Sequence, residues 1–210
     1  MSEPLTSLSC YEFAEQLASR APVPGGGGAA ALIGSLAAAL GSMATKLTLG
    51  KKKFLSYEED HERIISETEF LRGRFLELVE EDAAAFEPLS RVYSSDRNTS
   101  GYDEEFRNAV LNACRAPLEI MERCCMVIVL LEELLPKCSL LLLSDVGCAA
   151  LAAGCALESA SMNVFVNTRM LPDFADTIAM ATRADAMLSN YVPRARSISD
   201  SVMAHLRGIT

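Results

Sequence analysis

Apolar residues recur at intervals of three and four over most of this 210-residue sequence, and stretches with strand-like alternation are scarce. That spacing places apolar side chains on one face of an α-helix, so the sequence predicts an all-α protein. We expect an up-and-down bundle of about six helices, forming a single domain over residues 1–210. The predicted helices cover residues 9–20, 25–50, 57–92, 103–135 and 144–169, and a last helix follows Pro172.

Prolines and glycines set the expected breaks in this pattern. Pro117 should kink the fourth helix or mark a join between two segments, and Pro193 should interrupt the last one. Gly50 is a typical residue to end the second helix, because glycine readily adopts the left-handed conformation found there. The third helix is the long amphipathic one, and its apolar face is predicted to carry Phe75, Leu78, Val79, Phe86 and Leu89.

Two stretches of the chain carry almost no charge. None occurs from Ala21 to Thr45, and between Val146 and Asn167 only Glu158 is charged. Either stretch is long enough to span a bilayer. Both are built mainly from Ala, Gly and Ser, however, and their glycines and amides would make a poor lipid-facing surface. We therefore expect Gly/Ala-rich helices buried by close packing, with small residues at Gly34, Ala38 and Gly41 forming a seam, and no membrane partner.

The charge and cysteine content exclude several classes of function. Acidic residues outnumber Lys and Arg by 28 to 19, which argues against a nucleic-acid partner. The odd count of seven cysteines and a start without a basic, apolar leader favour a reducing, cytoplasmic location. His61 and His205 are isolated and no Cys-x-x-Cys pair occurs, so no metal site is expected and the cysteines are interpreted as small core residues.

Asp82 is the candidate acid–base residue of the long third helix. It lies four residues after Leu78 and four before Phe86, so it falls on the apolar face. Burial would raise its pKa, as a general base or acid requires. The alternative is a structural aspartate satisfied by a backbone or lysine partner.

Other polar residues stand in or beside the predicted buried helix. Asp145 follows four leucines and Ser144, a position that favours capping of the helix. Asn163 and Asn167 lie one turn apart, and such amides either hold helices together or bind a heterocycle.

Two further motifs surround the second predicted helix. Four glycines, Gly25 to Gly28, precede its alanines, which indicates positive φ angles or a close approach to the backbone. They lack the Gly-Lys-Ser/Thr of a phosphate-binding loop and follow no strand, so a nucleotide site is not supported. Lys51 to Lys53 form the densest positive cluster; such a run is usually just solvated, but it could attract a carboxylate tail.

Five blocks occur in order across almost the whole chain: APVPGGGGAAAL, LTLGKKKF, EEDAAAF, SDVGCAAL and SMNVFVN. Together they resemble the formiminotetrahydrofolate cyclodeaminase and methenyltetrahydrofolate cyclohydrolase family. The resemblance implies an all-α, homodimeric, cytosolic enzyme of one-carbon metabolism that needs no cofactor beyond its folate substrate. A cyclohydrolase adds water to 5,10-methenyltetrahydrofolate and leaves 10-formyltetrahydrofolate. A cyclodeaminase closes 5-formiminotetrahydrofolate to the methenyl compound and releases ammonia.

The resemblance also implies roles for individual residues. Asp82 would be general base and then general acid, and Asp145 would position the pterin ring or the water. Gly25 to Gly28 would let the backbone approach the folate, and Lys51 to Lys53 would meet its glutamate tail, which is expected to be polyglutamylated. Asn163 and Asn167 remain candidates for substrate binding.

The choice between the reactions rests on smaller features. PGGGG and NVFVN look more like the free-standing cyclohydrolases, so that activity is expected, with the cyclodeaminase as the alternative. The family commonly has a Gly-Asn pair before Ser144 and Asp145, whereas this chain reads PKCSLLLLSD, which puts any contact made by that pair in doubt. A helical scaffold without turnover is the non-enzymatic alternative.

Overall fold

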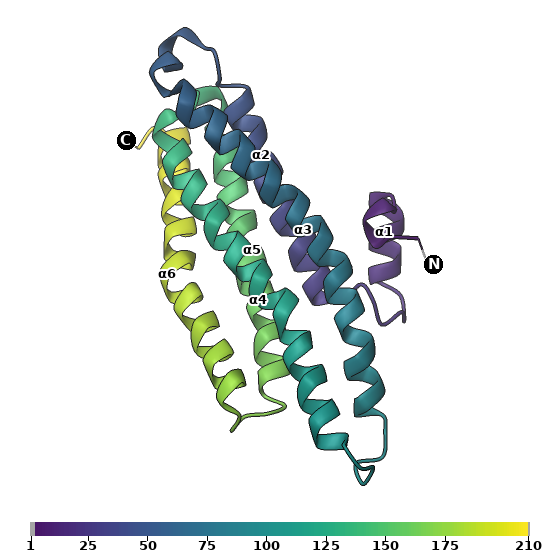
Figure 1. Cartoon of the computed structure of the whole chain (residues 1–210). Coiled ribbons are helices and arrows are strands. Elements are labelled where there is room, and N and C mark those ends of the chain that lie inside the picture. Colours follow the sequence, from purple (N-terminus) through teal and green to yellow (C-terminus); the bar gives the residue numbers. More distant parts are fainter. Residues whose placement is uncertain (1–2, 210) are drawn as a thin grey trace.

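The computed structural model describes residues 3–209, and all regular secondary structure within them is helical (Figure 1). The α-helices are α1 (Cys10–Leu17), α2 (Gly26–Lys46), α3 (Glu58–Tyr93), α4 (Tyr102–Leu134), α5 (Leu143–Thr168) and α6 (Ala175–Leu206). Short 3-10 turns occur at η1 (Leu5–Ser7), η2 (Lys52–Tyr57), η3 (Leu135–Lys137) and η4 (Leu140–Leu142). The predicted all-α fold is therefore confirmed.

The five long helices run side by side with alternating direction, and α1 stands at the side of the bundle near α3 (Figure 1). α5 is the central helix, because it packs against α2, α4 and α6. α2 also packs along α3. This arrangement places the start of α2, the second half of α3 and the end of α5 in one region.

Small residues allow these helices to approach closely. A Cβ atom on Gly34 would lie only 2.6 Å from Cε1 of Phe75, and one on Gly41 would lie 3.2 Å from Cδ2 of Leu131. Ala38, between them, is fully buried. The seam predicted on α2 is confirmed, and larger residues there would force the helices apart.

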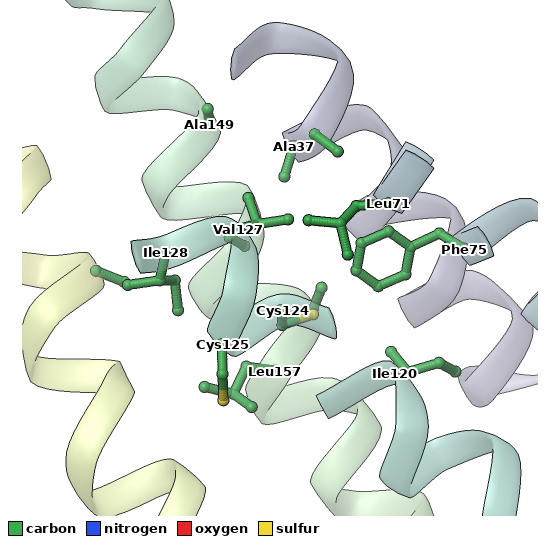
Figure 2. Close-up of a cluster of buried hydrophobic side chains, with 14 of the residues drawn as sticks. Ala37, Leu71, Phe75, Ile120, Cys124, Cys125, Val127, Ile128, Ala149 and Leu157 are labelled. Atoms are coloured by element: carbon green, nitrogen blue, oxygen red, sulfur yellow. The ribbon is translucent and has the colours of Figure 1, made fainter. Parts of the chain in front are cut away.

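Most of the core is one cluster of buried side chains between the helices, and a smaller separate cluster joins the end of α3 to the start of α4. Figure 2 shows Leu71 and Phe75 of α3 meeting Val127 of α4 near Ala37 of α2. Leu71, Phe75 and Leu157 are completely buried. Burying each such side chain contributes roughly 1.5–3 kcal/mol, so this cluster is the main source of the bundle's stability.

Several predicted helix boundaries differ from the structure. α4 continues through Pro117, and α6 continues through Pro193, so the predicted break in the last helix is wrong. Packing against neighbouring helices compensates for the missing backbone donors. α2 ends at Lys46, and a turn follows up to Gly50, which has a φ of 75°. α1 ends at Leu17 rather than near Arg20.

α2 and the segment Leu140–Thr168 are long and apolar enough to cross a membrane. In the bundle, 61% and 50% of their most apolar stretches are buried. Core helices have the same length and composition, and α5 is enclosed by three neighbours. The exposed parts of these two helices include large apolar side chains, among them Leu36 and Met43 of α2 and Leu151 and Met162 of α5.

Candidate functional site

A cavity of about 300 Å³ lies where the start of α2 meets α3, α4 and α5. Pro22 and Val23, in the segment before α2, form one wall together with Gly25, Gly26 and Gly27. α3 contributes Asp82 and Phe86, α4 contributes Ala113, and α5 contributes Asn163 and Asn167. The structure thus brings together three groups of residues that the sequence singled out separately.

One glycine of the run, Gly27, is required because the Asp82 carboxylate occupies the space beside it. A Cβ atom on Gly27 would lie 2.6 Å from Oδ2 of Asp82, a distance that real side chains do not adopt. A Cβ on Gly26 would lie 3.5 Å from the amide of Asn163, whereas one on Gly25 would meet nothing within 4 Å. None of these glycines has a positive φ, so backbone conformation does not explain the run. Close approach explains Gly27, and nothing in the structure requires glycine at positions 25, 26 and 28.

Asp82 sits beside the free N–H groups of the first turn of α2. Burial raises the pKa of its carboxyl group above the usual 3.8, and a hydrogen bond from the backbone of Gly28 works in the opposite direction. The positive end of the helix favours the carboxylate as well, yet the loss of water dominates. A carboxyl group at a cavity whose pKa is raised holds a proton more readily than a solvated one, which suits a group that must take up and return a proton.

The two acidic residues before Asp82 point elsewhere. Glu80 accepts hydrogen bonds from the backbone N–H and the hydroxyl of Thr6, at 2.9 and 3.0 Å. Glu81 is bound by the guanidinium of Arg74, with one contact at 3.0 Å. Of these three acidic residues, Asp82 is therefore the one that lines the cavity, as its position on the apolar face of the helix predicted.

The amides of Asn163 and Asn167 are held in fixed orientations. Nδ2 of Asn163 donates to the backbone oxygen of Ser159 at 3.0 Å, and Nδ2 of Asn167 donates to that of Ala113 at 3.0 Å. Within residues 3–209, neither Oδ1 atom has a hydrogen-bond donor or is a buried unpaired atom, so both remain accessible. Asn167 links α5 to α4, as the first interpretation of the pair predicts. Both amides line the cavity, and the binding of a heterocycle stays a prediction.

Phe86 is not buried on the apolar face of α3, so the prediction for this residue is wrong. Its side chain is 42% exposed and lines the cavity, whereas Phe75, Leu78, Val79 and Leu89 are buried as predicted. Phe86 lies one helical turn after Asp82, and an aromatic residue at that offset from a candidate acid was the available signal. Its ring offers a flat apolar surface for a heterocycle.

Two of the predicted groups lie away from the cavity. Lys51 to Lys53 stand exposed in the connection between α2 and α3, where Nζ of Lys51 donates to Oγ of Ser139 at 3.1 Å. α2 separates them from the glycines by about 30 Å at 1.5 Å per residue. Asp145 lies in the first turn of α5, while Asn163 and Asn167 lie near its end, roughly 27–33 Å farther along at the same rise.

Asp145 does not cap its helix. The N-cap residue of α5 is Leu142, whose side chain cannot accept a hydrogen bond, and Asp145 falls within the first turn. Leu140–Leu142 form a 3-10 turn that runs directly into α5 at Leu143, so the helix begins three residues earlier than a cap at position 145 requires. An acidic side chain in the first turn still complements the helix dipole.

The cysteines and other possible metal ligands are dispersed. Cys114, Cys124, Cys125 and Cys138 are buried, and Cys10, Cys148 and Cys155 are exposed, so the interpretation as core residues holds for four of them. Burial raises the pKa of Cys114 to about 11, which keeps that thiol protonated and unreactive. Within residues 3–209, no three His, Cys, Asp or Glu side chains are grouped so as to hold a metal ion.

Comparison with known protein families shows to which family the chain belongs. The model of the formiminotransferase-cyclodeaminase family matches residues 9–186, which include every residue of the site. The chain belongs to the formiminotransferase-cyclodeaminase family. The family recognised from the five sequence blocks is thereby confirmed.

Relatives within the formiminotransferase-cyclodeaminase family differ in length and in name. A methenyltetrahydrofolate cyclohydrolase of Methylorubrum extorquens is 39% identical over 170 residues, covering 78% of this chain and 80% of that protein. The formimidoyltransferase-cyclodeaminase of Rattus norvegicus is 30% identical over 177 residues, which are 80% of this chain but only 32% of that protein. These names confirm the expected class of folate-processing enzyme.

A solved structure shows the same fold. The formiminotetrahydrofolate cyclodeaminase of Thermotoga maritima superposes with a TM-score of 0.83 at 26% identity, covering 94% of this chain and 98% of that one. The helical bundle of this chain is therefore the fold of a cyclodeaminase.

Proposed function

We propose that this chain is a methenyltetrahydrofolate cyclohydrolase, which hydrolyses 5,10-methenyltetrahydrofolate to 10-formyltetrahydrofolate. The observation that carries the proposal is the burial of Asp82, with its raised pKa, against the glycines that wall the cavity. Of the described residues that line this cavity, Asp82 is the one with an ionisable side chain. Within one chain, its carboxyl group is therefore the side chain that can transfer protons at this cavity.

The reaction needs one group that moves protons in both directions. The Asp82 carboxylate accepts a proton from a water molecule as the water oxygen bonds to the cationic methenyl carbon between nitrogen-5 and nitrogen-10. The protonated Asp82 then returns that proton to nitrogen-5 as the bond between this nitrogen and the carbon breaks. The hydroxyl proton is lost to solvent as the formyl C=O forms. A carboxylate also stabilises the positive charge of the bound substrate.

The cavity matches one end of a folate. A volume of about 300 Å³ is at the small end of ligand sites, so it can enclose the pterin ring but not the whole molecule. The benzoyl group and the glutamate tail must then extend over the surface. Lys51 to Lys53 offer the positive charge that a polyglutamate tail needs, but they stand at the far end of α2 in the same chain.

A second copy of the chain would bring its own lysines close to this cavity. Leu36 and Met43 of α2 are exposed, as is Leu47 directly after its last turn, and the neighbouring α5 exposes Leu151, Met162 and Val166. Exposed apolar rows on adjacent helices are typical of an interface between subunits. The chain is accordingly proposed to be a homodimer that assembles through α2 and α5.

The symmetry of such a dimer explains the position of the lysines. A two-fold axis perpendicular to α2 and α5 pairs this face with itself and reverses the helix direction between subunits. The lysine end of one subunit then lies next to the glycine end of the other. In this arrangement Lys51 to Lys53 and Asp145 of one copy lie beside the cavity of its partner and contact the substrate bound there. We place this dimer in the cytoplasm, with no cofactor beyond folate.

Cyclodeaminase activity is the second candidate. In that reaction nitrogen-10 attacks the formimino carbon, and Asp82 would transfer the proton to the departing ammonia. The 26%-identical Thermotoga structure favours this candidate. The 39% identity to a cyclohydrolase of comparable length favours the first one.

Assaying both folates side by side separates the candidates. Purified protein mixed with 5,10-methenyltetrahydrofolate should bleach the characteristic absorbance of the methenyl compound faster than buffer does. Incubation with 5-formiminotetrahydrofolate should produce that absorbance much more slowly or not at all. The reverse result would establish the cyclodeaminase, and no change with either substrate would leave a scaffold. Asp82→Asn protein, purified identically, controls for contaminating host enzymes.

A further inference from the structure

Pro117 lies within α4 at a position that affects the cavity one turn away. In an α-helix the N–H of each residue bonds to the carbonyl four residues earlier, and proline has no N–H. The carbonyl that position 117 leaves free is that of Ala113. Ala113 is only 7% exposed and lines the cavity, so its oxygen needs another donor.

Asn167 of α5 supplies that donor. Its Nδ2 atom bonds to the oxygen of Ala113 at 3.0 Å. Because an amide carries its nitrogen and oxygen on opposite branches, binding the nitrogen to α4 fixes the direction of Oδ1. That oxygen has no donor within the part of the chain described, residues 3–209, and it remains accessible at the cavity wall.

We propose that Pro117 is a positioning residue of the active site, which orients Asn167 so that Oδ1 accepts a hydrogen bond from the pterin ring. The inference rests on the proposed function, because the aminopyrimidine edge of a pterin carries the N–H donors that such an oxygen recognises. Asn163 presents its Oδ1 atom in the same way, one turn earlier on α5. The two amides thus form an acceptor pair that selects rings with a donor edge.

The other two prolines inside helices, Pro88 of α3 and Pro193 of α6, have no such effect. Pro88 leaves free the carbonyl of Ala84, which is exposed to solvent. Pro193 leaves free the carbonyl of Ser189 in α6, and Ser189 is exposed to solvent. Water can satisfy that oxygen. Pro193→Ala is therefore a matched control for Pro117→Ala, because both add one N–H to the middle of a long helix.

A thermal-stability comparison tests the link between Pro117 and Asn167 without any substrate. Asn167→Leu should lower the melting temperature, because the Ala113 carbonyl loses its donor. The double variant Pro117→Ala/Asn167→Leu should regain that loss, since residue 117 then supplies the missing N–H. Asn163→Leu should cost less, because the Ser159 carbonyl keeps its bond within α5. A double variant no more stable than Asn167→Leu would overturn the proposal, as would a Pro117→Ala protein less stable than wild type.

Steady-state kinetics with 5,10-methenyltetrahydrofolate tests the role in binding. Pro117→Ala should raise KM by about 3- to 10-fold, the effect of losing one uncharged hydrogen bond, and leave kcat within about twofold. Pro193→Ala should change neither value. In the Asn167→Leu background, Pro117→Ala should have no further effect on KM. An unchanged KM in Pro117→Ala would refute the positioning role.

The two arms also separate this inference from the proposed function. If wild-type protein turned over neither folate, the proposed function would fall. The stability comparison would still decide whether Pro117 acts through Asn167.

Discussion

A Cβ atom on Gly27 would lie 2.5 Å from Cγ of Asp82, so the carboxyl group fits against the first turn of α2 because residue 27 has no side chain. Glycine at position 27 and the burial of the Asp82 carboxyl group therefore depend on each other. The glycine lets the carboxyl group lie against the end of a helix, and the same position removes it from water and raises its pKa.

Gly27→Ala should therefore damage both the fold and the chemistry. The added methyl group must push the Asp82 side chain or the start of α2 aside, at a cost of about 1–3 kcal/mol in unfolding free energy. A displaced acid–base group should lower kcat by about 100-fold, because the reaction depends on its position. Urea denaturation and the methenyl absorbance assay measure the two effects.

Gly73→Ala is the matched control for that substitution. Gly73 also lies in a helix, and a Cβ atom there would meet nothing within 4 Å. The change should raise the unfolding free energy by about 0.5–1 kcal/mol, the usual gain for alanine over glycine in a helix. Equal turnover in the two variants would show that the space beside Asp82 is not critical.

The free energy of unfolding should depend on pH through the protonation of Asp82. Its pKa is raised in the folded state, so the folded state holds the proton more tightly than the unfolded state does. The resulting stabilisation is fully present below the ordinary value of 3.8 and is lost as pH rises through the higher folded value. Asp82→Asn lacks this loss, so the wild type should fall relative to the variant across that range. Denaturation curves at several pH values measure the difference, and a constant gap would contradict the burial of the carboxyl group.

Phe86 should contribute to binding through its ring. Phe86→Ala should raise KM for the methenyl substrate about 3- to 10-fold, because stacking of aromatic rings is worth about 0.5–1.5 kcal/mol. Phe70→Ala removes an equally large ring from the same helix, where the side chain is 61% exposed and outside the cavity. The two variants should therefore differ in KM. A matching KM for both would show that Phe86 does not touch the substrate.

The proposed dimer predicts that assembly and polyglutamate binding are lost together. Leu36→Glu places a charge in the exposed apolar row of α2 and should produce monomers in sedimentation experiments. KM for a polyglutamylated substrate should then rise toward that of the monoglutamate, because the partner's lysines no longer reach the tail.

Phe70→Glu is the control for this change, since Phe70 is exposed on α3, away from the α2 and α5 rows. It should leave both the assembly and the preference for polyglutamate unaltered. A monomeric Leu36→Glu variant that still prefers the long tail would argue that Lys51 to Lys53 act within their own chain or not at all.

The sequence predicts the fold and the centre of the site because both follow from local geometry. The interval of four residues places Asp82 on the apolar face of α3, and the same interval aligns Asn163 with Asn167. The glycine run indicates close approach without saying what approaches it. The distances between the start of α2, α3 and α5 depend on packing of the whole bundle, which residue spacing does not contain.

The differences between prediction and structure have physical causes as well. Pro193 does not interrupt α6, because packing along a 32-residue helix outweighs one lost hydrogen bond. Asp145 looked like a cap because helix starts usually need a polar acceptor, but here a 3-10 turn of leucines leads into α5. Pro117 does not break α4, and the Ala113 carbonyl that it leaves free accepts a hydrogen bond from Nδ2 of Asn167.

The most direct test of the account is the turnover of 5,10-methenyltetrahydrofolate by the Asp82→Asn variant. The substitution keeps the shape of the side chain and removes its ability to exchange a proton. The folded helical content should be retained, and kcat should fall by about 100- to 10,000-fold, the range contributed by general acid–base catalysis. A folded Asp82→Asn protein that hydrolyses the substrate at the wild-type rate would contradict the assignment of Asp82.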